Sequence, residues 1–399
     1  MKICFYTDSI FTFGGVQRVL AVVAKALSEK HDITILTMDD PSAENLSMYD
    51  LNTSNISYHF LKYEKLSFWE YLPCKAYSFL YKYVIPQTKQ TTHWYGYSSF
   101  PKSRREKLIQ FVNQRDFDVV VAVHAFFSFH LVTIKNKIKG KIIGWMHNSF
   151  DAFFKEPNRY LWKQEKRFCH EMPLLDDVVV LTNYDKEIYK EKMHLNTTVI
   201  YNPLTITPKG KGSPEKKKFL SIGRLYAQHK GFDILIKAFA IFAQNNTDWT
   251  LDIVGEGPDG DFLRSMIHEY KLEDRIMIYP FTNQVQKHYA SSSVFVLSSR
   301  WEGFGLVLIE AMSSFLPVIA TDLPVIREII GSSNAAVFFE KENELDLAEK
   351  MRSLANSDEL NKTGLDAFRH ASKFSLPVIC KQWEDLLLKQ INLTGSYEK

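Results

Sequence analysis

The chain has 399 residues, 45% of them hydrophobic, which is enough for two packed domains of roughly 200 residues each. The formal net charge of +3 at pH 7 gives no support to nucleic-acid binding. Four widely separated cysteines without a C-x-x-C pair argue against a disulfide framework and a zinc site. Asp8 interrupts the first apolar run, and no run reaches about 18 residues. We therefore expect a cytoplasmic protein without a signal peptide or a membrane span.

Short β-branched and aromatic runs alternate with helical patterns along the whole chain, which predicts a doubly wound α/β architecture. In the N-terminal half the predicted strands are Lys2–Tyr6, Ile33–Thr37, Val119–Val123, Lys141–Trp145 and Asp177–Thr182. A Gly14-Gly15 turn opens a helix predicted over Val16–Leu27, where the Gly15 amide can face a ligand. A plain tight turn explains the glycine pair equally well. His147 follows a strand, where ligand contacts occur in such sheets, although a structural histidine is as good an explanation.

The insert 41–115 carries no recognised motif, but its composition is unusual. From Phe60 to Arg105 the chain interleaves aromatic residues with basic ones: Phe68, Trp69, Tyr71, Tyr77, Phe79, Tyr81 and Tyr83 with Lys62, Lys65, Lys75, Lys82, Lys89, Lys102, Arg104 and Arg105. Aromatic rings suit a lipid headgroup boundary, and nearby cations attract anionic lipid. We therefore predict salt-sensitive, peripheral binding to an anionic membrane surface, at the inner face of the plasma membrane. Packing of the aromatic rings on the N-terminal domain is the alternative.

The sequence Asp116-Phe117-Asp118 matches the D-x-D pattern of metal-dependent transferases. It precedes a strand, whereas a metal-binding pair is expected at the far end of one. We interpret it as a solvated strand start. Because no cluster of His, Cys and carboxylate residues has ligand spacing either, no metal is predicted.

A segment rich in Pro, Gly, Ser and Lys, Thr205–Lys218, predicts a solvated linker between two halves. After it the pattern restarts, with strands predicted at Phe219–Ile222, Thr250–Val254, Arg275–Tyr279, Val294–Leu297, Pro317–Ala320 and Ala336–Phe339. Two such halves would leave a cleft between them, lined by the carboxyl ends of their strands. The predicted domains are 1–203, 204–376 and a final helical segment, 377–399.

Two cations follow the first strand after the linker. Arg224 comes directly after that strand, and Lys230 precedes a helix. Both should lie at the carboxyl edge of the second sheet, where they could hold a diphosphate and neutralise the charge of a leaving group. Two solvated loop charges are the alternative.

The run Gly255 to Gly260 matches G-x-G-x-x-G after a strand. A dinucleotide site would normally open its domain, and the next strand should end in an acidic residue. Here another strand comes first, and the next one ends in Tyr279-Pro280-Phe281. We interpret the glycines as a tight turn near a nucleotide and take Gly255 and Phe281 as candidate contacts.

The most informative segment is R-W-E-G-F-G-L-V-L-I-E-A, in which Glu302 and Glu310 flank a Gly-Phe-Gly turn. A strand precedes Glu302, and a helix is predicted over Leu306–Met312. A strand, a glycine turn and a helix together offer free amides to a phosphate. Glu310, about two turns into the helix, could accept hydrogen bonds from the two hydroxyls of a ribose. The combination predicts a nucleotide site, and solvated glutamates are the alternative.

Together these segments resemble the retaining family 4 glycosyltransferases of the GT-B fold, of the type that builds bacterial surface polysaccharides. The resemblance spans nearly the whole chain. It rests on G-G-V-Q-R-V (14–19), W-M-H-N (145–148), G-R-L with K-G (223–231), V-G-E-G-P (254–258), E-G-F-G-L-V-L-I-E-A (302–311) and L-P-V-I-A-T-D (316–322). Gln17 departs from the glutamate that many relatives have.

The resemblance implies a donor that is a UDP-, GDP- or similar nucleotide-sugar, with a UDP-sugar expected, used without a metal ion or cofactor. Arg224 and Lys230 would hold the diphosphate, and Glu310 the ribose. Glu302 and the amides of the turn would contact the sugar and the phosphates; the turn consists of Gly303, Phe304 and Gly305. Gly15 and His147 would contact the donor from the N-terminal domain, to which the last helix would return. The anomeric configuration would be retained without a protein nucleophile, because the donor phosphate takes the acceptor's proton.

Three functions remain open from the sequence. The first is a sugar transferase that acts on a saccharide or a lipid-linked acceptor. The second is a nicotinamide-dependent oxidoreductase, which rests on the run Gly255 to Gly260. The third is a non-catalytic protein that only binds a nucleotide-sugar. A phosphorylase of the same fold is disfavoured, because no lysine stands out for pyridoxal phosphate.

Overall fold

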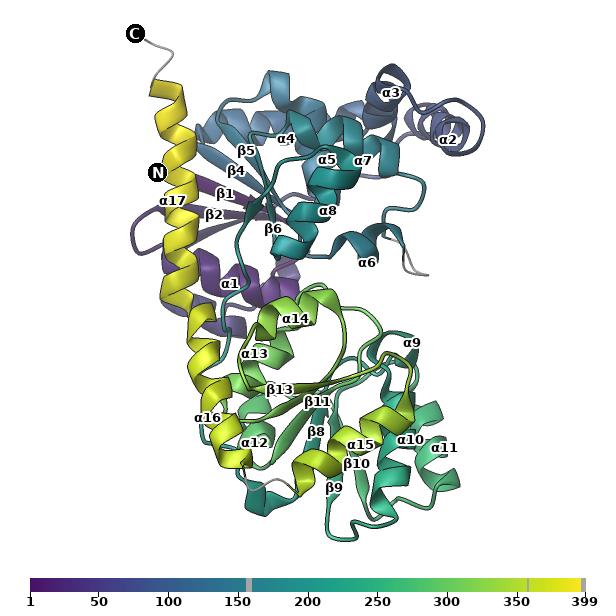
Figure 1. Ribbon diagram of the computed structural model, residues 1–399. Helices are drawn as coiled ribbons and strands as arrows, with labels where there is room; N and C mark the ends of the chain where they lie inside the picture. Colours follow the sequence, from purple (N-terminus) through teal and green to yellow (C-terminus); the bar gives the residue numbers. More distant parts are fainter. Residues whose placement is uncertain (156–159, 357–358, 396–399) are drawn as a thin grey trace. The chain divides into compact units, whose positions relative to one another are not determined.

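The computed structural model describes residues 1–155, 160–356 and 359–395, which form two compact α/β units (Figure 1). Unit 1 comprises Met1–Pro203 and Leu376–Lys399, and unit 2 comprises Leu204–Ser375. Among the described residues, no helix combines the length and apolar character needed to cross a membrane.

Unit 1 contains a seven-stranded parallel sheet in the order β3-β2-β1-β4-β5-β6-β7. Its strands are β1 (Lys2–Tyr6), β2 (Asp32–Thr37), β3 (Ile56–Phe60), β4 (Val119–Val123), β5 (Lys141–Trp145), β6 (Asp177–Val180) and β7 (Thr198–Val199). Its helices are α1 (Gly15–Leu27), α2 (Phe68–Tyr83), α3 (Lys89–Ser99), α4 (Lys102–Arg115), α5 (Ala125–Ile134), α6 (Phe150–Phe154), α7 (Glu165–Glu171), α8 (Asn183–Met193) and α17 (Leu376–Gly395).

Unit 2 contains a six-stranded parallel sheet in the order β10-β9-β8-β11-β12-β13. Its strands are β8 (Lys218–Ile222), β9 (Thr250–Val254), β10 (Ile276–Tyr279), β11 (Val294–Leu297), β12 (Val318–Thr321) and β13 (Ala336–Phe339). Its helices are α9 (Ala227–Lys230), α10 (Phe232–Ala243), α11 (Gly260–Glu269), α12 (Val285–Ala290), α13 (Leu306–Ser313), α14 (Pro324–Ile330), α15 (Glu344–Ala355) and α16 (Leu360–Ala371).

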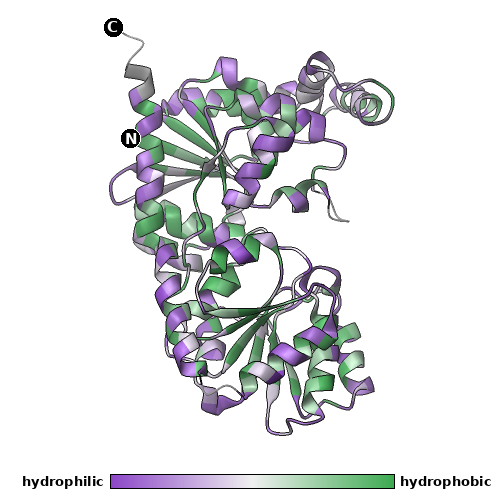
Figure 2. Cartoon of the chain, viewed as in Figure 1, coloured by the Kyte–Doolittle hydropathy of each residue, from purple (hydrophilic) through white to green (hydrophobic). Residues whose placement is uncertain are grey.

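The strands form where the sequence has short, almost continuous apolar runs, such as V-V-V-A-V in β4 and V-F-V-L in β11. Every residue of these two strands is buried, because helices cover both faces of a parallel sheet. The green strands inside each unit in Figure 2 show the same arrangement. Side-chain caps fix several helix starts: Thr182 accepts a hydrogen bond from the Asp185 amide at α8, and Asn343 accepts one from the Asp346 amide at α15. The prediction of two doubly wound α/β domains is confirmed.

Both sheets follow the same strand order, and it determines where ligands can bind. The order reverses between β1 and β4 in unit 1 and between β8 and β11 in unit 2. Ligands of such sheets bind beyond the carboxyl ends of the strands at this switch point. The residues that directly follow these strands are Thr7 and His124 in unit 1, and Gly223 and Ser298 in unit 2.

Two features of the fold differ from the sequence predictions. The strands β3 and β7 were not predicted; β3 lies inside the insert and pairs with β2 at the sheet edge. The segment Thr205–Lys218 is not a freely solvated linker, because it is hydrogen-bonded to the rest of unit 2. The Gly212 amide donates to the Ser314 carbonyl (2.9 Å), and the Ser213 amide donates to the Ser292 carbonyl (3.0 Å).

The final helix α17 belongs to unit 1, where it packs on α1. Lys30 forms an ion pair with Glu384 of this helix (2.8 Å). The ring of Trp383 lies edge-on against Trp145 of β5, with 4.7 Å between ring centroids. Unit 1 is therefore built from both ends of the chain.

Candidate functional site

A buried ion pair lies at the switch point of unit 2. Lys230, at the end of α9, places its Nζ 2.6 Å from Oε1 of Glu302, which follows β11. The two side chains are only 17% and 8% exposed. Ser299 donates a further hydrogen bond to the same carboxylate oxygen (2.6 Å). The structure thus brings together two of the predicted catalytic residues. Because removing two charges from water costs more than a well-packed apolar pair would, the charges themselves indicate a function.

The surroundings of Glu302 keep its carboxylate ionised. Burial by itself would raise the pKa of Glu302, but Lys230, His229 and the hydrogen bonds from Lys230 and Ser299 together lower it below its ordinary value. His229 stacks on Trp301 with 4.5 Å between ring centroids. Burial and the neighbouring Lys230 lower the pKa of His229 to about 4. At neutral pH the site therefore contains a carboxylate that can only accept hydrogen bonds, beside a neutral imidazole.

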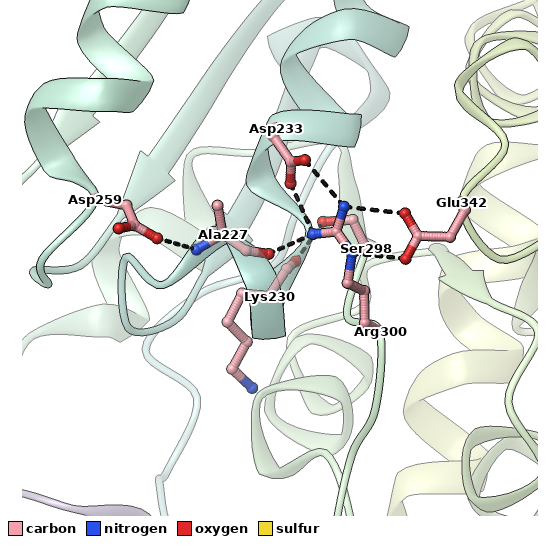
Figure 3. Close-up of polar contacts among 7 residues, drawn as sticks. All are labelled: Ala227, Lys230, Asp233, Asp259, Ser298, Arg300 and Glu342. Atoms are coloured by element: carbon pink, nitrogen blue, oxygen red, sulfur yellow. Dashed lines mark hydrogen bonds and ion pairs between the residues drawn. The ribbon is translucent and has the colours of Figure 1, made fainter. Parts of the chain in front are cut away.

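Arg300 ties together the segments around Lys230 (Figure 3). Its guanidinium group pairs with both carboxylate oxygens of Asp233 in α10, each at 2.9 Å. It also pairs with Glu342, which follows β13, at 2.6 and 2.9 Å. A further hydrogen bond reaches the Ala227 carbonyl at the start of α9. The planar fork of arginine makes this bridging geometry possible.

The backbone of α9 is held against the loop that follows β11. Ser298 donates to the Lys230 carbonyl (2.8 Å), and the Arg300 amide donates to the His229 carbonyl (2.8 Å). Gly231 adopts a positive φ of 63°, and a Cβ there would lie 2.1 Å from the Ser298 carbonyl oxygen. The side chain of Lys230 extends away from these contacts (Figure 3). Backbone contacts thus fix the position of Lys230, and its ammonium group forms the ion pair with Glu302.

The glycine turn before α13 leaves backbone donors unpaired beside Glu302 among the described residues. Within the described residues, the amides of Gly303, Gly305 and Leu306 have no hydrogen-bond partner. Gly305 caps the helix with a φ of 87°. The side chain of Phe304 is 3% exposed and packs edge-on against Phe374 at 5.8 Å, so only its backbone can contact a ligand. The free amides and the helix N-terminus suit an anion.

Glu310 of α13 is buried, with 1% of its surface exposed. Thr205 donates a hydrogen bond to one carboxylate oxygen (3.0 Å), and Tyr289 donates to the other (3.0 Å). A carboxylate oxygen can accept more than one hydrogen bond, so the hydroxyls of a ribose could share these oxygens with Thr205 and Tyr289. The sequence predicts the carboxylate but neither of the hydroxyl groups that orient it.

The other predicted residues of unit 2 differ in their surroundings. Arg224 is exposed, and its side chain makes no hydrogen bond or ion pair with the described residues. Gly255 has a φ of 154°, and a Cβ there would lie 1.9 Å from the Gly223 carbonyl oxygen, so this glycine lets two loops approach closely. Phe281 is 48% exposed, and its amide donates to Glu256 (3.3 Å). Gly255 therefore has a packing role that does not depend on a ligand.

In unit 1, His147 lies beyond the carboxyl end of β5. Its ring contacts that of Trp145, with 4.3 Å between centroids. Burial lowers the pKa of His147 to about 3, so the imidazole is neutral at neutral pH. Its Nε2 is buried and has no hydrogen-bond partner in the described part of the chain. A buried polar atom without a partner is costly, which makes Nε2 a candidate ligand contact.

His124, which the sequence analysis did not identify, lies at the switch point of unit 1 and caps α5. Its φ of 97° is unusual for a residue with a side chain, and such strain is concentrated at functional sites. Nε2 lies 3.1 Å from Nδ2 of Asn148, and burial lowers the pKa of His124 to about 4. The sequence pattern that made His147 a candidate also applies to His124, because His124 follows a strand.

Gly15 is the exposed first residue of α1. A Cβ on the preceding Gly14 would lie 2.2 Å from the side-chain oxygen of Gln17, so Gly14 leaves room for the residue that departs from the family pattern. Asp118 accepts a hydrogen bond from the Lys2 amide at the start of β1 (2.7 Å), as befits a strand start. The described ranges contain no group of three or more His, Cys, Asp and Glu side chains placed to hold a metal ion.

The chain is similar to known proteins both in sequence and in structure. A family model described as "Glycosyltransferase Family 4" matches residues 13–207, and one described as "Glycosyl transferases group 1" matches residues 205–364. An uncharacterized glycosyltransferase of Haemophilus influenzae is 28% identical over 397 residues, covering 97% of this chain and 99% of that protein.

Two further matches are informative. The N-acetylgalactosamine-N,N'-diacetylbacillosaminyl-diphospho-undecaprenol 4-alpha-N-acetylgalactosaminyltransferase of Campylobacter jejuni is 32% identical over 170 residues, covering 41% of this chain and 46% of that protein. The crystal structure of Anabaena HepE in complex with UDP and glucose has a TM-score of 0.73 and 17% identity, covering 97% of this chain and 99% of that one. At this identity the structural likeness shows the fold alone.

Proposed function

Because the chain belongs to the family 4 glycosyltransferases of the GT-B fold, we propose that it transfers a hexose from a UDP-sugar, with retention of the anomeric configuration. The proposed acceptor is a saccharide or a lipid-linked saccharide in the synthesis of a surface polysaccharide or glycolipid. Family membership leaves no support for the oxidoreductase alternative. The observation that carries the proposal is the buried pair of Lys230 and Glu302 beside the free amides of the α13 turn.

The donor is proposed to bind in unit 2. Its diphosphate would be held by the amides of Gly303 and Gly305, by Lys230 and by Arg224, whose guanidinium group has no other partner among the described residues. The ribose would bind to the carboxylate of Glu310. A UDP donor is supported by the related fold of HepE, whose crystal structure contains UDP and glucose.

In the proposed reaction, the bond between the anomeric carbon and the β-phosphate oxygen breaks. A bond from the acceptor's hydroxyl oxygen forms on the same face, and the hydroxyl proton passes to the departing phosphate oxygen. Lys230 and Arg224 balance the negative charge that grows on the diphosphate. Glu302, which is ionised, accepts hydrogen bonds from the sugar and stabilises the positive charge that develops at the anomeric carbon. It does not act as a general acid, because its pKa is lowered.

The neutral imidazoles of unit 1 suit uncharged hydroxyl groups. We assign contacts with the transferred sugar to Gly15 and His147, and we add His124 to this set. The Nε2 of His147, which lacks a protein partner in the described chain, would gain a hydrogen bond from a sugar hydroxyl.

An acceptor on a lipid carrier would place the chain at an anionic membrane surface. The name of the Campylobacter relative includes a diphospho-undecaprenol carrier, and the cations of the insert 41–115 agree with such a surface. This part of the proposal concerns the acceptor, and the donor site does not depend on it.

The direct test is nucleotide release from a panel of UDP- and GDP-sugars, followed by NMR of the anomeric proton in any glycoside formed on an added saccharide acceptor. We expect slow UDP release from at least one UDP-sugar and a product with the donor's anomeric configuration. Glu302→Gln should reduce the release, whereas the exposed control Glu349→Gln should not. An inverted product would contradict retention. Binding of UDP-sugars with no release under any condition would indicate a non-catalytic binding protein.

A further inference from the structure

The helix α2 of unit 1 presents one apolar face, its outer face, whose large side chains are each at least 40% exposed. It lies beside α3 at one end of the unit (Figure 1). Its large exposed side chains are Phe68 (62%), Trp69 (83%), Tyr71 (46%), Leu72 (50%), Phe79 (60%), Leu80 (40%) and Tyr83 (57%), followed by Val84 (63%). A contiguous exposed patch of this kind on a folded protein marks an interaction surface.

Residues on the opposite face of α2 pack within unit 1. Tyr81 is buried, stacks on Tyr95 with 4.2 Å between ring centroids, and its hydroxyl lies 3.0 Å from that of Thr92. Tyr77 donates to the Thr91 carbonyl (3.0 Å). The aromatic residues of the insert therefore fall into two groups. Tyr77 and Tyr81 pack on the rest of unit 1, which is the alternative that the sequence offered for all aromatic residues of the insert. The exposed aromatic residues of the outer face do not follow this alternative.

The charges around the outer face are predominantly positive. Residues 60–105 contain eight Lys and Arg residues and two Glu residues. One of the two acids, Glu70, already accepts hydrogen bonds from Ser103 (2.9 and 3.1 Å). Lys75 lies over the ring of Tyr71 at 5.5 Å, and Lys163 lies over the ring of Tyr83 at 3.8 Å. These cations border the apolar side chains directly.

Not every cation of the insert is available. Arg105 donates to the carbonyls of Tyr97 and Phe100 and lies over the ring of Tyr97 at 4.5 Å. Arg104 lies over the ring of Tyr63 at 5.3 Å. Both arginines are therefore partly engaged inside unit 1. Lys62 forms an ion pair with Asp40 (3.4 Å), whereas Lys65, Lys75 and Lys89 are exposed and Lys82 is partly exposed.

We propose that the outer face of α2 inserts into the headgroup region of an anionic lipid bilayer, parallel to the membrane plane. The apolar face enters the interface, and the lysines at its border contact acidic headgroups. A helix of 16 residues lying flat fits this mode, whereas the described helices include none suited to span a membrane. The charge pattern selects the occupant: two copies of this basic face would repel each other, whereas an anionic bilayer attracts it.

The proposal differs from lysine attraction alone in its response to salt. Attraction between surface charges is largely screened at about 0.5 M salt, where the Debye length is below roughly 8 Å. Burial of Trp69, Leu72 and Phe79 is not screened. We therefore expect part of the binding to persist in high salt. If the protein bound only through the attraction of its cations to acidic headgroups, high salt would abolish the binding.

The experiment is vesicle sedimentation of the full chain, without nucleotide, on phosphatidylcholine vesicles and on vesicles that contain about 30% phosphatidylglycerol. We expect wild type to bind the anionic vesicles and to retain measurable binding in high salt. The triple substitution Trp69→Ser, Leu72→Ser and Phe79→Ser should weaken partitioning at least tenfold at both salt concentrations. Lys75→Glu with Lys82→Glu should weaken it about tenfold at low salt only.

The matched control replaces three exposed apolar residues on other helices, Phe262→Ser, Leu345→Ser and Leu388→Ser, whose side chains are 52%, 67% and 50% exposed. It should bind vesicles like wild type. Because the replaced α2 side chains are exposed, the triple variant should keep its melting temperature, and its UDP affinity should not change. This separates loss of lipid binding from loss of the proposed donor site.

Three outcomes would overturn the proposal. The first is wild-type protein that sediments with neither type of vesicle. The second is a triple variant that partitions like wild type. The third is a concentration-dependent dimer in light scattering that the triple substitution abolishes while vesicle binding is absent, which would make a second copy of the chain the occupant.

Discussion

The two switch points have the same strand order but different chemistry. In unit 2 the residues after β8 and β11 include charged groups, with the buried pair of Lys230 and Glu302 and the bridging Arg300. In unit 1 the residues after β4 and its neighbour β5 include imidazole, amide and aromatic groups, among them His124 and His147, and the carboxylate of Asp8 after β1 lies near His124. The topology creates a place for a ligand in both units, and the loop side chains decide which ligand it is.

The difference follows from what each type of side chain can do at neutral pH. Lysine, arginine and free helix amides compensate an anion, which a diphosphate requires. Neutral imidazoles both donate and accept hydrogen bonds, which suits uncharged hydroxyls. One fold used twice in a chain can therefore divide a reaction between a site for the charged leaving group and a site for neutral sugar.

The largest expected effect is that of Lys230→Ala on turnover. We expect kcat for UDP release to fall about 10²–10³-fold, because the charge on the leaving group grows in the transition state. The measurement is initial rate at saturating donor, with the exposed Lys271→Ala as the matched control in the same unit. Full activity in Lys230→Ala would remove this lysine from the diphosphate.

Glu310→Ala should act on binding. We expect UDP affinity to fall by about 1.5–3 kcal/mol, the scale of hydrogen bonds to a charged group. Titration calorimetry measures it, and Tyr289→Phe, which leaves the carboxylate in place, is the comparison variant. A mutant with a lower melting temperature but unchanged UDP affinity would show that Glu310 only orders Thr205 and Tyr289.

Acid should destabilise the protein chiefly through unit 1. Burial lowers the pKa of His130 and His147 to about 3 and that of His124 to about 4. The unfolded chain, with pKa values near 6.5, binds more protons than the folded chain between that pH and these lower values. Stability should therefore fall as the pH falls through this window, by at most about 1.4 kcal/mol per pH unit for each histidine.

The check is the melting temperature between pH 7.5 and 5 for wild type and for His130→Gln, which should have a shallower slope. The exposed His194→Asn is the control and should keep the wild-type slope. Equal slopes in all three proteins would mean that these histidines do not control the acid response.

His147→Ala should slow turnover about tenfold, the scale of one neutral hydrogen bond, and leave UDP affinity unchanged. The UDP affinity tests the proposed difference between the two units, because contacts with the charged groups of UDP are assigned to unit 2. His124→Ala should behave in the same way. A marked loss of UDP affinity in either variant would contradict the division between a charged and a neutral site.

The smallest expected effect is that of chelation. We expect EDTA to leave turnover unchanged, because in the proposed donor site lysine, arginine and helix amides would take the place of a divalent metal at the diphosphate. If EDTA abolished activity and Mn²⁺ or Mg²⁺ restored it, Asp116 and Asp118 would have to be reconsidered, although Asp118 already holds the Lys2 amide.

Most of the strands could be predicted because a parallel sheet covered on both faces leaves a continuous apolar run in the sequence. The strand β3 could not, because an edge strand is half solvated; its residues I-S-Y-H-F are intermediate or exposed. The prediction of a solvated linker at Thr205–Lys218 was wrong for a related reason. The composition of this segment reflects only its local backbone preference. Its amides donate hydrogen bonds to the carbonyls of Ser292 and Ser314, and these acceptors are distant in the sequence.

The sequence by itself determined the two α/β units, the family, and the positions of Lys230, Glu302 and Glu310, because strand ends and glycine turns are local patterns. Only the tertiary structure decided which side chains share a charge or a hydrogen bond. The ion pair of Lys230 with Glu302 and the hydrogen bonds of Thr205 and Tyr289 to Glu310 join segments that are far apart in the chain. The outer face of α2 is exposed because the rest of the described fold does not pack against it. Such contacts leave no periodic signal, because the partner is chosen by the fold and not by its neighbours in sequence.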